Sequence, residues 1–186
     1  MEARRLEYFF YFLFYSFVGF LLEIAFARIT RSPRKQRKCF YLLPLCPVYG
    51  AGALALIALP AWIAGNLWLL FPCAVALATA IEYAFSLFYD LAFGVRFWDY
   101  SDRRFHVRGR ICPLFSLAWG FFGILLLWGV QPRIAPLIQG VPAAIGIFLA
   151  TVLLSDALYS AWRLRRYRTP AALRWKAFSG EPQRIQ

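Results

Sequence analysis

Long runs of apolar residues alternate with short polar segments along this 186-residue chain. Five runs are long enough to cross a bilayer as helices, because about 20 helical residues cover the hydrocarbon core. Lipid tolerates only elements that satisfy their own backbone groups, and apolar runs of this length are typical of helices. The pattern therefore predicts an all-α, polytopic membrane bundle of five transmembrane helices in one domain over residues 1–162. The expected spans are about 6–29, 42–64, 67–93, 111–130 and 135–162.

Basic residues are distributed unevenly between these runs. They concentrate after the first run, at residues 94–110 and in the tail at 163–186, whereas the two other turns carry only Arg133. Segments rich in Lys and Arg stay in the cytoplasm. Five spans then place the N-terminus outside and the basic tail in the cytoplasm. Arg4 and Arg5 oppose this orientation, although the nearby acids offset them.

The composition and charge of the chain indicate which binding partners to expect. The chain is 61% hydrophobic and 16% charged, with a net charge of +12. In a soluble protein that charge would suggest nucleic acid, but here the basic residues flank apolar runs, so anionic lipids are the expected partner and nucleic acid is not. Four cysteines without a C-x-x-C pair and one histidine do not make a metal site. We expect neither a metal nor a cofactor.

The first two hairpins share a pattern. In each, a glutamate inside the first run is followed by a basic segment and then by a Cys-Pro pair, at Cys46-Pro47 and Cys112-Pro113. Both hairpins would have the same orientation, which favours a parallel repeat followed by a fifth helix. Proline is also common in the first turn of any helix, so the pair is equally compatible with two ordinary helix starts.

Four carboxylates lie inside the predicted spans: Glu23, Glu82, Asp90 and Asp156. Each costs about 2.5 kcal/mol or more if it is left in hydrocarbon, so each must face the bundle interior, water or a cation. Glu82 is the deepest, since Arg96 lies about 20 Å further along its helix. The other three lie close to basic segments.

Small polar residues extend these acids into stripes. Thr79, Glu82, Ser86 and Asp90 share one helix face by their i, i+3 and i+4 spacing. Turning the polar faces of the first, third and fifth spans toward each other predicts a polar cavity that opens to the cytoplasm. In the alternative interpretation each acid pairs with a loop arginine and fixes a helix end. That structural role is favoured for Asp90 and Asp156, and a functional role for Glu82.

The segment at 97–110 combines aromatic residues, two acids and the one histidine. We interpret it as a folded cap at the membrane surface, organised by Asp99, Asp102 and Arg110. The alternative is an amphipathic segment that binds anionic lipid. Tyr49, beside the prolines that precede the second span, is expected to line the entrance of the cavity.

Several short motifs occur between and within the predicted spans. They are Tyr15-Ser16-Phe17-Val18-Gly19-Phe20 with Glu23, Pro44-Leu45-Cys46-Pro47-Val48-Tyr49-Gly50, Glu82-Tyr83, Phe97-Trp98-Asp99-Tyr100-Ser101, and Gly109-Arg110-Ile111-Cys112 followed by Ser116 and Trp119-Gly120. Together these motifs resemble those of a bacterial family of ABC-transporter type IV integral membrane proteins. The resemblance implies a permease-like protein of the bacterial plasma membrane, which would work with a separate cytoplasmic ATPase subunit. No G-x-x-x-x-G-K-[ST] motif occurs in the chain.

The leading functional hypothesis is a transport-related component whose acidic pocket binds a cation or a cationic solute. A second is a membrane-embedded enzyme that acts on a lipid or isoprenoid phosphate headgroup. A third is a non-catalytic assembly or regulatory subunit, and a homo-oligomer is compatible with each. The expected ligand-binding residues are Glu23, Tyr49, Glu82, Ser86, Asp90, Asp99, Asp102 and Arg110.

Overall fold

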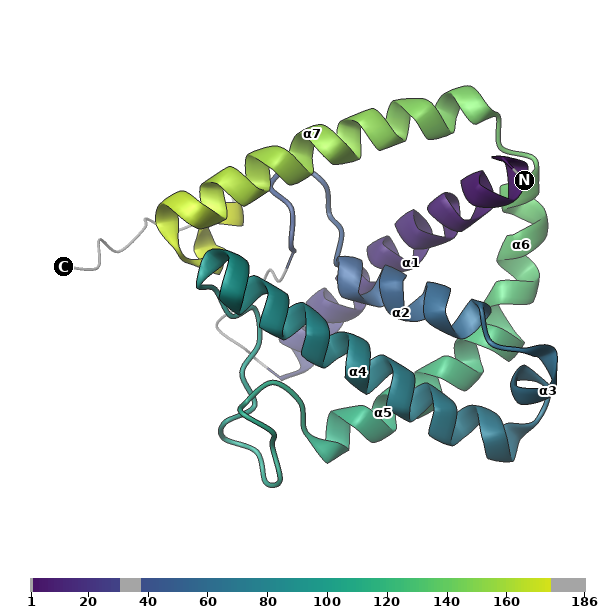
Figure 1. Ribbon diagram of the computed structural model, residues 1–186, viewed down its shortest axis with the longest axis horizontal. Helices are drawn as coiled ribbons and strands as arrows, with labels where there is room; N and C mark the ends of the chain where they lie inside the picture. Colours follow the sequence, from purple (N-terminus) through teal and green to yellow (C-terminus); the bar gives the residue numbers. More distant parts are fainter. Residues whose placement is uncertain (1, 31–37, 175–186) are drawn as a thin grey trace.

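The computed structural model describes residues 2–30 and 38–174, and over these residues the regular structure is helical (Figure 1). The basic residues at 31–37 and the tail beyond residue 174 lie outside the described residues. The helices are α1 (Glu2–Ile29), α2 (Pro47–Ile57), α3 (Ala61–Ala64), α4 (Leu67–Phe93), α5 (Pro113–Ile124), the π-helical η1 (Leu125–Val130), α6 (Gln131–Gln139), α7 (Ala143–Tyr167) and the short η2 (Pro170–Leu173).

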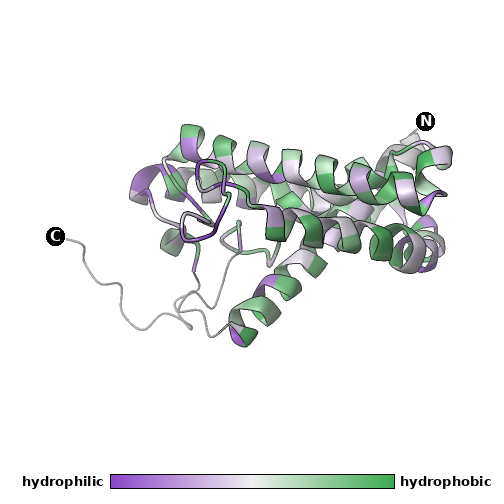
Figure 2. Ribbon diagram, turned by 90° about the horizontal axis from the view of Figure 1, so that it is seen from below, coloured by the Kyte–Doolittle hydropathy of each residue, from purple (hydrophilic) through white to green (hydrophobic). Residues whose placement is uncertain are grey.

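Four helical stretches are long and apolar enough to cross a membrane. They run over Leu6–Ile29, Leu67–Phe93, Pro113–Gln139 and Ala143–Tyr167. Their outer faces expose large apolar side chains, and Figure 2 shows hydrophobic residues along the helix bodies. Apolar surface on this scale suits lipid rather than water. The predicted all-α membrane bundle is confirmed, and the chain is a multi-pass membrane protein.

The second predicted span, 42–64, is not one continuous helix. Only Pro47–Ile57 forms an apolar helix, and its 11 residues cover about 16 Å. Prolines at 44, 47 and 60 prevent a longer helix, because proline lacks an N–H and its ring collides with the preceding turn. The chain still passes from one end of the molecule to the other over this segment (Figure 1). Among the described residues, the four long apolar helices are thus accompanied by one shorter passage that is only partly helical.

The expected turn at 131–133 is also wrong, because the helix continues there. α5 passes through η1 into α6 and ends at Gln139. The backbone N–H of Gln131 bonds to the carbonyl of Leu126, five residues earlier. This wider π-type turn makes room for Pro132, which a regular helix would exclude. The turn follows at 140–142, so α7 begins at Ala143 and extends to Tyr167 rather than over 135–162.

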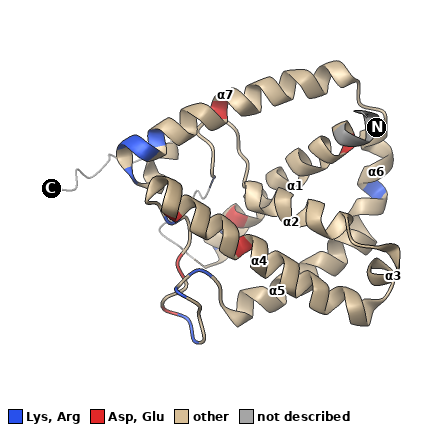
Figure 3. Cartoon of the chain, in the orientation of Figure 1, with Lys and Arg blue, Asp and Glu red and all other residues tan. Residues whose placement is uncertain are grey.

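Lys and Arg gather at one end of the molecule, which we call the basic end. It includes Arg28 at the end of α1, Arg96 and Arg110 in the loop between α4 and α5, and Arg163 near the end of α7. Figure 3 shows this concentration, with one basic position on α6 lying away from it. By the positive-inside rule, an end of this kind is expected to face the cytoplasm.

The extended segment 38–46 has its backbone held by side chains of α7. The N–H groups of Leu42 and Leu43 both donate to the carboxylate of Asp156, at 2.7–3.0 Å. The N–H of Tyr41 donates to the hydroxyl of Ser160 at 2.8 Å, which in turn lies 3.2 Å from Asp156. Asp156 and Ser160 therefore replace the hydrogen bonds that a helix would have made within the segment.

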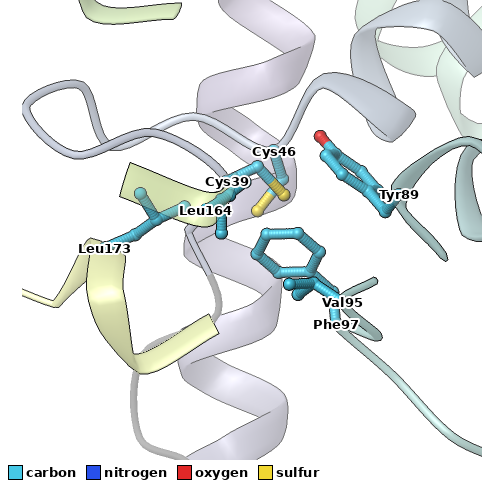
Figure 4. Close-up of a cluster of buried hydrophobic side chains, with 7 residues drawn as sticks. All are labelled: Cys39, Cys46, Tyr89, Val95, Phe97, Leu164 and Leu173. Atoms are coloured by element: carbon cyan, nitrogen blue, oxygen red, sulfur yellow. The ribbon is translucent and has the colours of Figure 1, made fainter. Parts of the chain in front are cut away.

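The rest of this segment is bonded to itself and to α1. The N–H of Cys39 donates to the carbonyl of Leu45 at 3.1 Å, and that of Cys46 donates to the carbonyl of Ser16 at 3.0 Å. Both cysteines lie in a buried apolar cluster at the basic end, where Figure 4 shows their side chains beside the ring of Phe97. The cluster joins this segment to α4, α7 and the loop after α4. Its buried members are Cys39, Cys46, Tyr89, Val95, Phe97, Leu164 and Leu173.

The two hairpins, α1–α2 and α4–α5, are arranged in parallel, since both first helices run toward the basic end (Figure 1). Glycines let the helices of each hairpin approach closely. A Cβ on Gly50 would lie 2.6 Å from the backbone carbonyl of Phe12 on α1, and one on Gly120 would lie 2.6 Å from Phe71 on α4. Small residues at such contacts are the usual means of packing helices in lipid.

The role of Asp156 can be tested by stability. Replacing Asp156 by Ala should lower the free energy of unfolding by about 2–6 kcal/mol, because two part-buried backbone N–H groups lose their acceptor at about 1–3 kcal/mol each. Asp156→Asn, which keeps one acceptor oxygen, should lose about half as much. Unfolding in mixed detergent micelles measures both. Thr151→Ala on an exposed position of α7 is the control; an equal loss there would contradict the assignment.

Candidate functional site

A cavity of about 260 Å³ lies between α1, α2, α4, α5 and the loop after α4, toward the basic end. Glu23 and Glu82 both line it. Over the part of the chain that the structure describes, the lining includes no Lys, Arg or His. Most of the remaining wall is aromatic, from Phe26, Tyr49, Phe97, Trp98, Tyr100, Phe115, Trp119 and Phe122.

Glu82 is the most deeply buried carboxylate of the cavity, with 4% of its surface exposed. One carboxylate oxygen accepts a hydrogen bond from the hydroxyl of Tyr100 at 2.8 Å. The other accepts from the indole N–H of Trp119 at 3.0 Å. Both donors are neutral, and within residues 2–30 and 38–174 Glu82 forms no ion pair. Because a carboxylate has about four acceptor positions, its hydrogen-bonding capacity is not exhausted.

Glu23 faces the same cavity from α1. Its carboxylate accepts a hydrogen bond from the hydroxyl of Tyr49 at 2.8 Å. Tyr49 fits against α1 because residue 19 is glycine, where a Cβ would lie 2.2 Å from the tyrosine ring. The ring of Tyr49 meets that of Trp119 edge to face, with centroids 5.0 Å apart. The two carboxylates are thus joined through one pair of aromatic side chains.

Tyr100 belongs to the loop after α4 and lines the cavity at the basic end. Its ring stacks on that of Phe115, with centroids 4.8 Å apart. Burial, together with the neighbouring Glu82 carboxylate, raises the pKa of Tyr100 well above its ordinary value. Tyr100 therefore stays protonated and donates to Glu82 at any physiological pH.

A second cavity, of about 170 Å³, continues toward the opposite end of the molecule. It shares Tyr49, Glu82 and Trp119 with the first cavity. Its far wall includes Tyr15 and Val130, which lie well away from the basic end. The aromatic pair and Glu82 therefore stand at the boundary between two cavities that follow one another along the bundle.

Three of the expected site residues form a separate cluster beside the cavity. The guanidinium of Arg110 donates to Ser86 at 3.2 Å and to Asp90 at 2.5 Å, and Arg96 lies 3.5 Å from Asp90. None of these four side chains lines the first cavity. Arg110 is buried, with 7% of its surface exposed, so this ion pair attaches the loop to α4. It matches the structural interpretation of Asp90.

The loop at 97–110 is folded, as its composition predicts, but its two acids differ. Asp99 accepts hydrogen bonds from the N–H and the hydroxyl of Ser101, at 3.0 and 2.6 Å, and these bonds lower the pKa of Asp99. Gly109 has a φ of +71°, and a Cβ there would lie 2.6 Å from Asp99. Asp102 is exposed and lies 3.7 Å from Arg103, away from the cavity.

Sequence reasoning did not identify Tyr100 and Trp119 as partners of Glu82. Both residues lie in motifs that carry the family resemblance. A buried acid without a cation on its own helix needs hydrogen-bond donors from elsewhere. Tyr and Trp are the aromatic residues that carry such a donor, so they could have been expected as its partners. The polar face of the fifth span was expected to join the cavity, but Asp156 on α7 instead holds the extended segment, which is a structural role of the kind favoured for it.

Comparison with known proteins gives one family. The family model described as "Putative ABC-transporter type IV" matches residues 10–161. No curated protein and no solved structure matches the chain. The matched region contains both hairpins, the loop between α4 and α5, and all residues that line the cavity.

The Arg110–Asp90 pair can be measured with a double-mutant cycle. Combining Arg110→Gln with Asp90→Asn should reveal a coupling energy of about 1–3 kcal/mol in the free energy of unfolding, because the pair is hydrogen-bonded and largely buried. The exposed pair Asp102–Arg103 is the control, and its coupling should stay below about 0.5 kcal/mol. Equal coupling in the two cycles would show that the Arg110 pair does not fix the loop.

Proposed function

The chain belongs to the ABC-transporter type IV family, and on that premise we propose that it is a permease-like component of a transport system in the bacterial plasma membrane. In this proposal the acidic cavity opens to the cytoplasmic side and binds a cation or a cationic group. Glu23 and Glu82 provide the negative charge. Tyr49, Tyr100 and Trp119 hold the two carboxylates in position.

The observation that carries the proposal is the environment of Glu82. Its carboxylate is buried and bonded only to neutral donors in the described residues. A buried charge without a counter-charge is costly, and a carboxylate in a protein interior attracts a cation more strongly than it would in water. Glu23 adds a second carboxylate to the same wall. A bound cation would offset the cost of burying Glu82.

The phosphate-directed enzyme gains no support from this geometry. A phosphorylated headgroup needs cationic donors, and arginine is the usual one. The described lining of the cavity contains none, and Arg110 is already engaged with Asp90 and Ser86.

A separate ATPase subunit would meet the protein at the basic end. The loop after α4 presents Phe105, of which 84% is exposed, between exposed arginines. Phe105 has a φ of +59°, a conformation that costs energy for a bulky residue. The folded loop thus holds an apolar side chain outward, where a cytoplasmic partner can contact it.

Ligand-dependent thermal stabilisation tests the site. Purified wild-type protein should be stabilised by a member of a panel of inorganic and organic cations, and Glu82→Gln should reduce the apparent affinity at least tenfold, because the buried negative charge is lost. The measurement is the midpoint of thermal unfolding in detergent against ligand concentration.

The matched control is Glu7→Gln. Glu7 lies on α1 with Glu23 but about 24 Å away along the helix, so its removal should leave the stabilisation unchanged. If Glu82→Gln and wild type respond equally to every cation, Glu82 is structural and the proposed function is wrong for this cavity.

A further inference from the structure

We propose that the ligand of the cavity is a small organic cation, of the alkylated ammonium class, rather than an inorganic ion. This inference rests on the proposed function and names its substrate class. It follows from what the wall offers besides the two carboxylates.

An inorganic cation needs more oxygen ligands than the wall supplies. Ca²⁺ and Mg²⁺ take six or more oxygen ligands at short distances. The cavity offers two carboxylates, and their oxygens already accept bonds from Tyr49, Tyr100 and Trp119. Over residues 2–30 and 38–174 no group of three or more His, Cys, Asp or Glu residues is placed to hold a metal ion. A bare ion would therefore lose hydration without replacement.

An alkylated ammonium fits the same wall well. Its charge is spread over methyl or methylene groups, which can be buried against apolar surface. Aromatic faces attract such cations, and aromatic cages are the usual way to recognise them. The aromatic side chains of the lining come from α1, from α2, from the loop between α4 and α5, and from α5. They therefore surround the space on several sides. Two carboxylates at one edge complete the site.

The volume limits the ligand to a compact one. Because one water molecule occupies about 30 Å³ of liquid, a cavity of about 260 Å³ corresponds to about nine waters. A tetraalkylated ammonium with short substituents fits within this volume. The second cavity beyond Tyr49 and Trp119 gives the same ligand room to continue along the bundle.

Substitution of Phe122 distinguishes an aromatic site for an alkylated ammonium from a site for any cation. It lines both cavities and carries no polar atom, so Phe122→Leu removes a π-face with little change in volume. The neighbouring Phe121 lines neither cavity and is more exposed, at 65% against 43% for Phe122, so Phe121→Leu is the matched control. Phe122→Tyr keeps the ring. If Phe122→Leu does not fold, Phe115→Leu replaces it at another ring of the same wall.

The experiment titrates wild type and these variants with tetramethylammonium, Na⁺, K⁺ and Mg²⁺, using thermal stabilisation in detergent. We expect saturable stabilisation by tetramethylammonium, abolished in Glu82→Gln, weakened about three- to tenfold in Phe122→Leu, and preserved in Phe121→Leu and Phe122→Tyr. Stabilisation by the inorganic ions alone would overturn this inference and leave the proposed function standing. Stabilisation by none of the four would overturn both. A tetramethylammonium response that depends on Glu82 but not on Phe122 or Phe115 would overturn the aromatic site.

Discussion

Every backbone N–H that enters a bilayer needs an acceptor within the protein, because lipid supplies none. Four long helices of this protein meet that condition by themselves. The second crossing does not, since its first part is extended and its helix has only 11 residues. Proline at positions 44 and 47 removes two donors, and α7 supplies a carboxylate and a hydroxyl for three others. Asp156 on α7 therefore has a structural role, because its carboxylate is occupied by these backbone groups.

The cavity is a consequence of that arrangement. Because α2 starts late, Tyr49 lies in its first turn and beside Glu23, which is near the basic end of α1. In the second hairpin the glutamate is deeper, and its aromatic partner Trp119 lies in the second turn of α5. The two hairpins thus repeat one pairing of a helix glutamate with an aromatic donor, shifted along the bundle. Their packing brings the two aromatic rings into contact.

The sequence predicted the elements that depend on local properties. Apolar runs predicted the long helices, and the need to remove Glu23 and Glu82 from lipid predicted that both would face one interior space. Features that depend on distant residues could not be predicted. The shortening of the second span could be suspected from its prolines, but its partner Asp156 lies more than 110 positions away. The continuation through Pro132 depends on a π-type turn that has no sequence signature of its own. For Glu82, helix periodicity gave the face but not the donors, which come from a loop and from another helix.

The hydrogen bonds of the extended segment also constrain how the protein is made. A helix can leave the insertion machinery with its backbone already satisfied, whereas the N–H groups of Leu42 and Leu43 find their acceptor on α7, which is synthesised more than 100 residues later. The second crossing must therefore remain at the membrane surface, or in contact with a chaperone or the insertion channel, until translation of α7 is complete. A chain truncated before α7 would lack the acceptor for these two N–H groups.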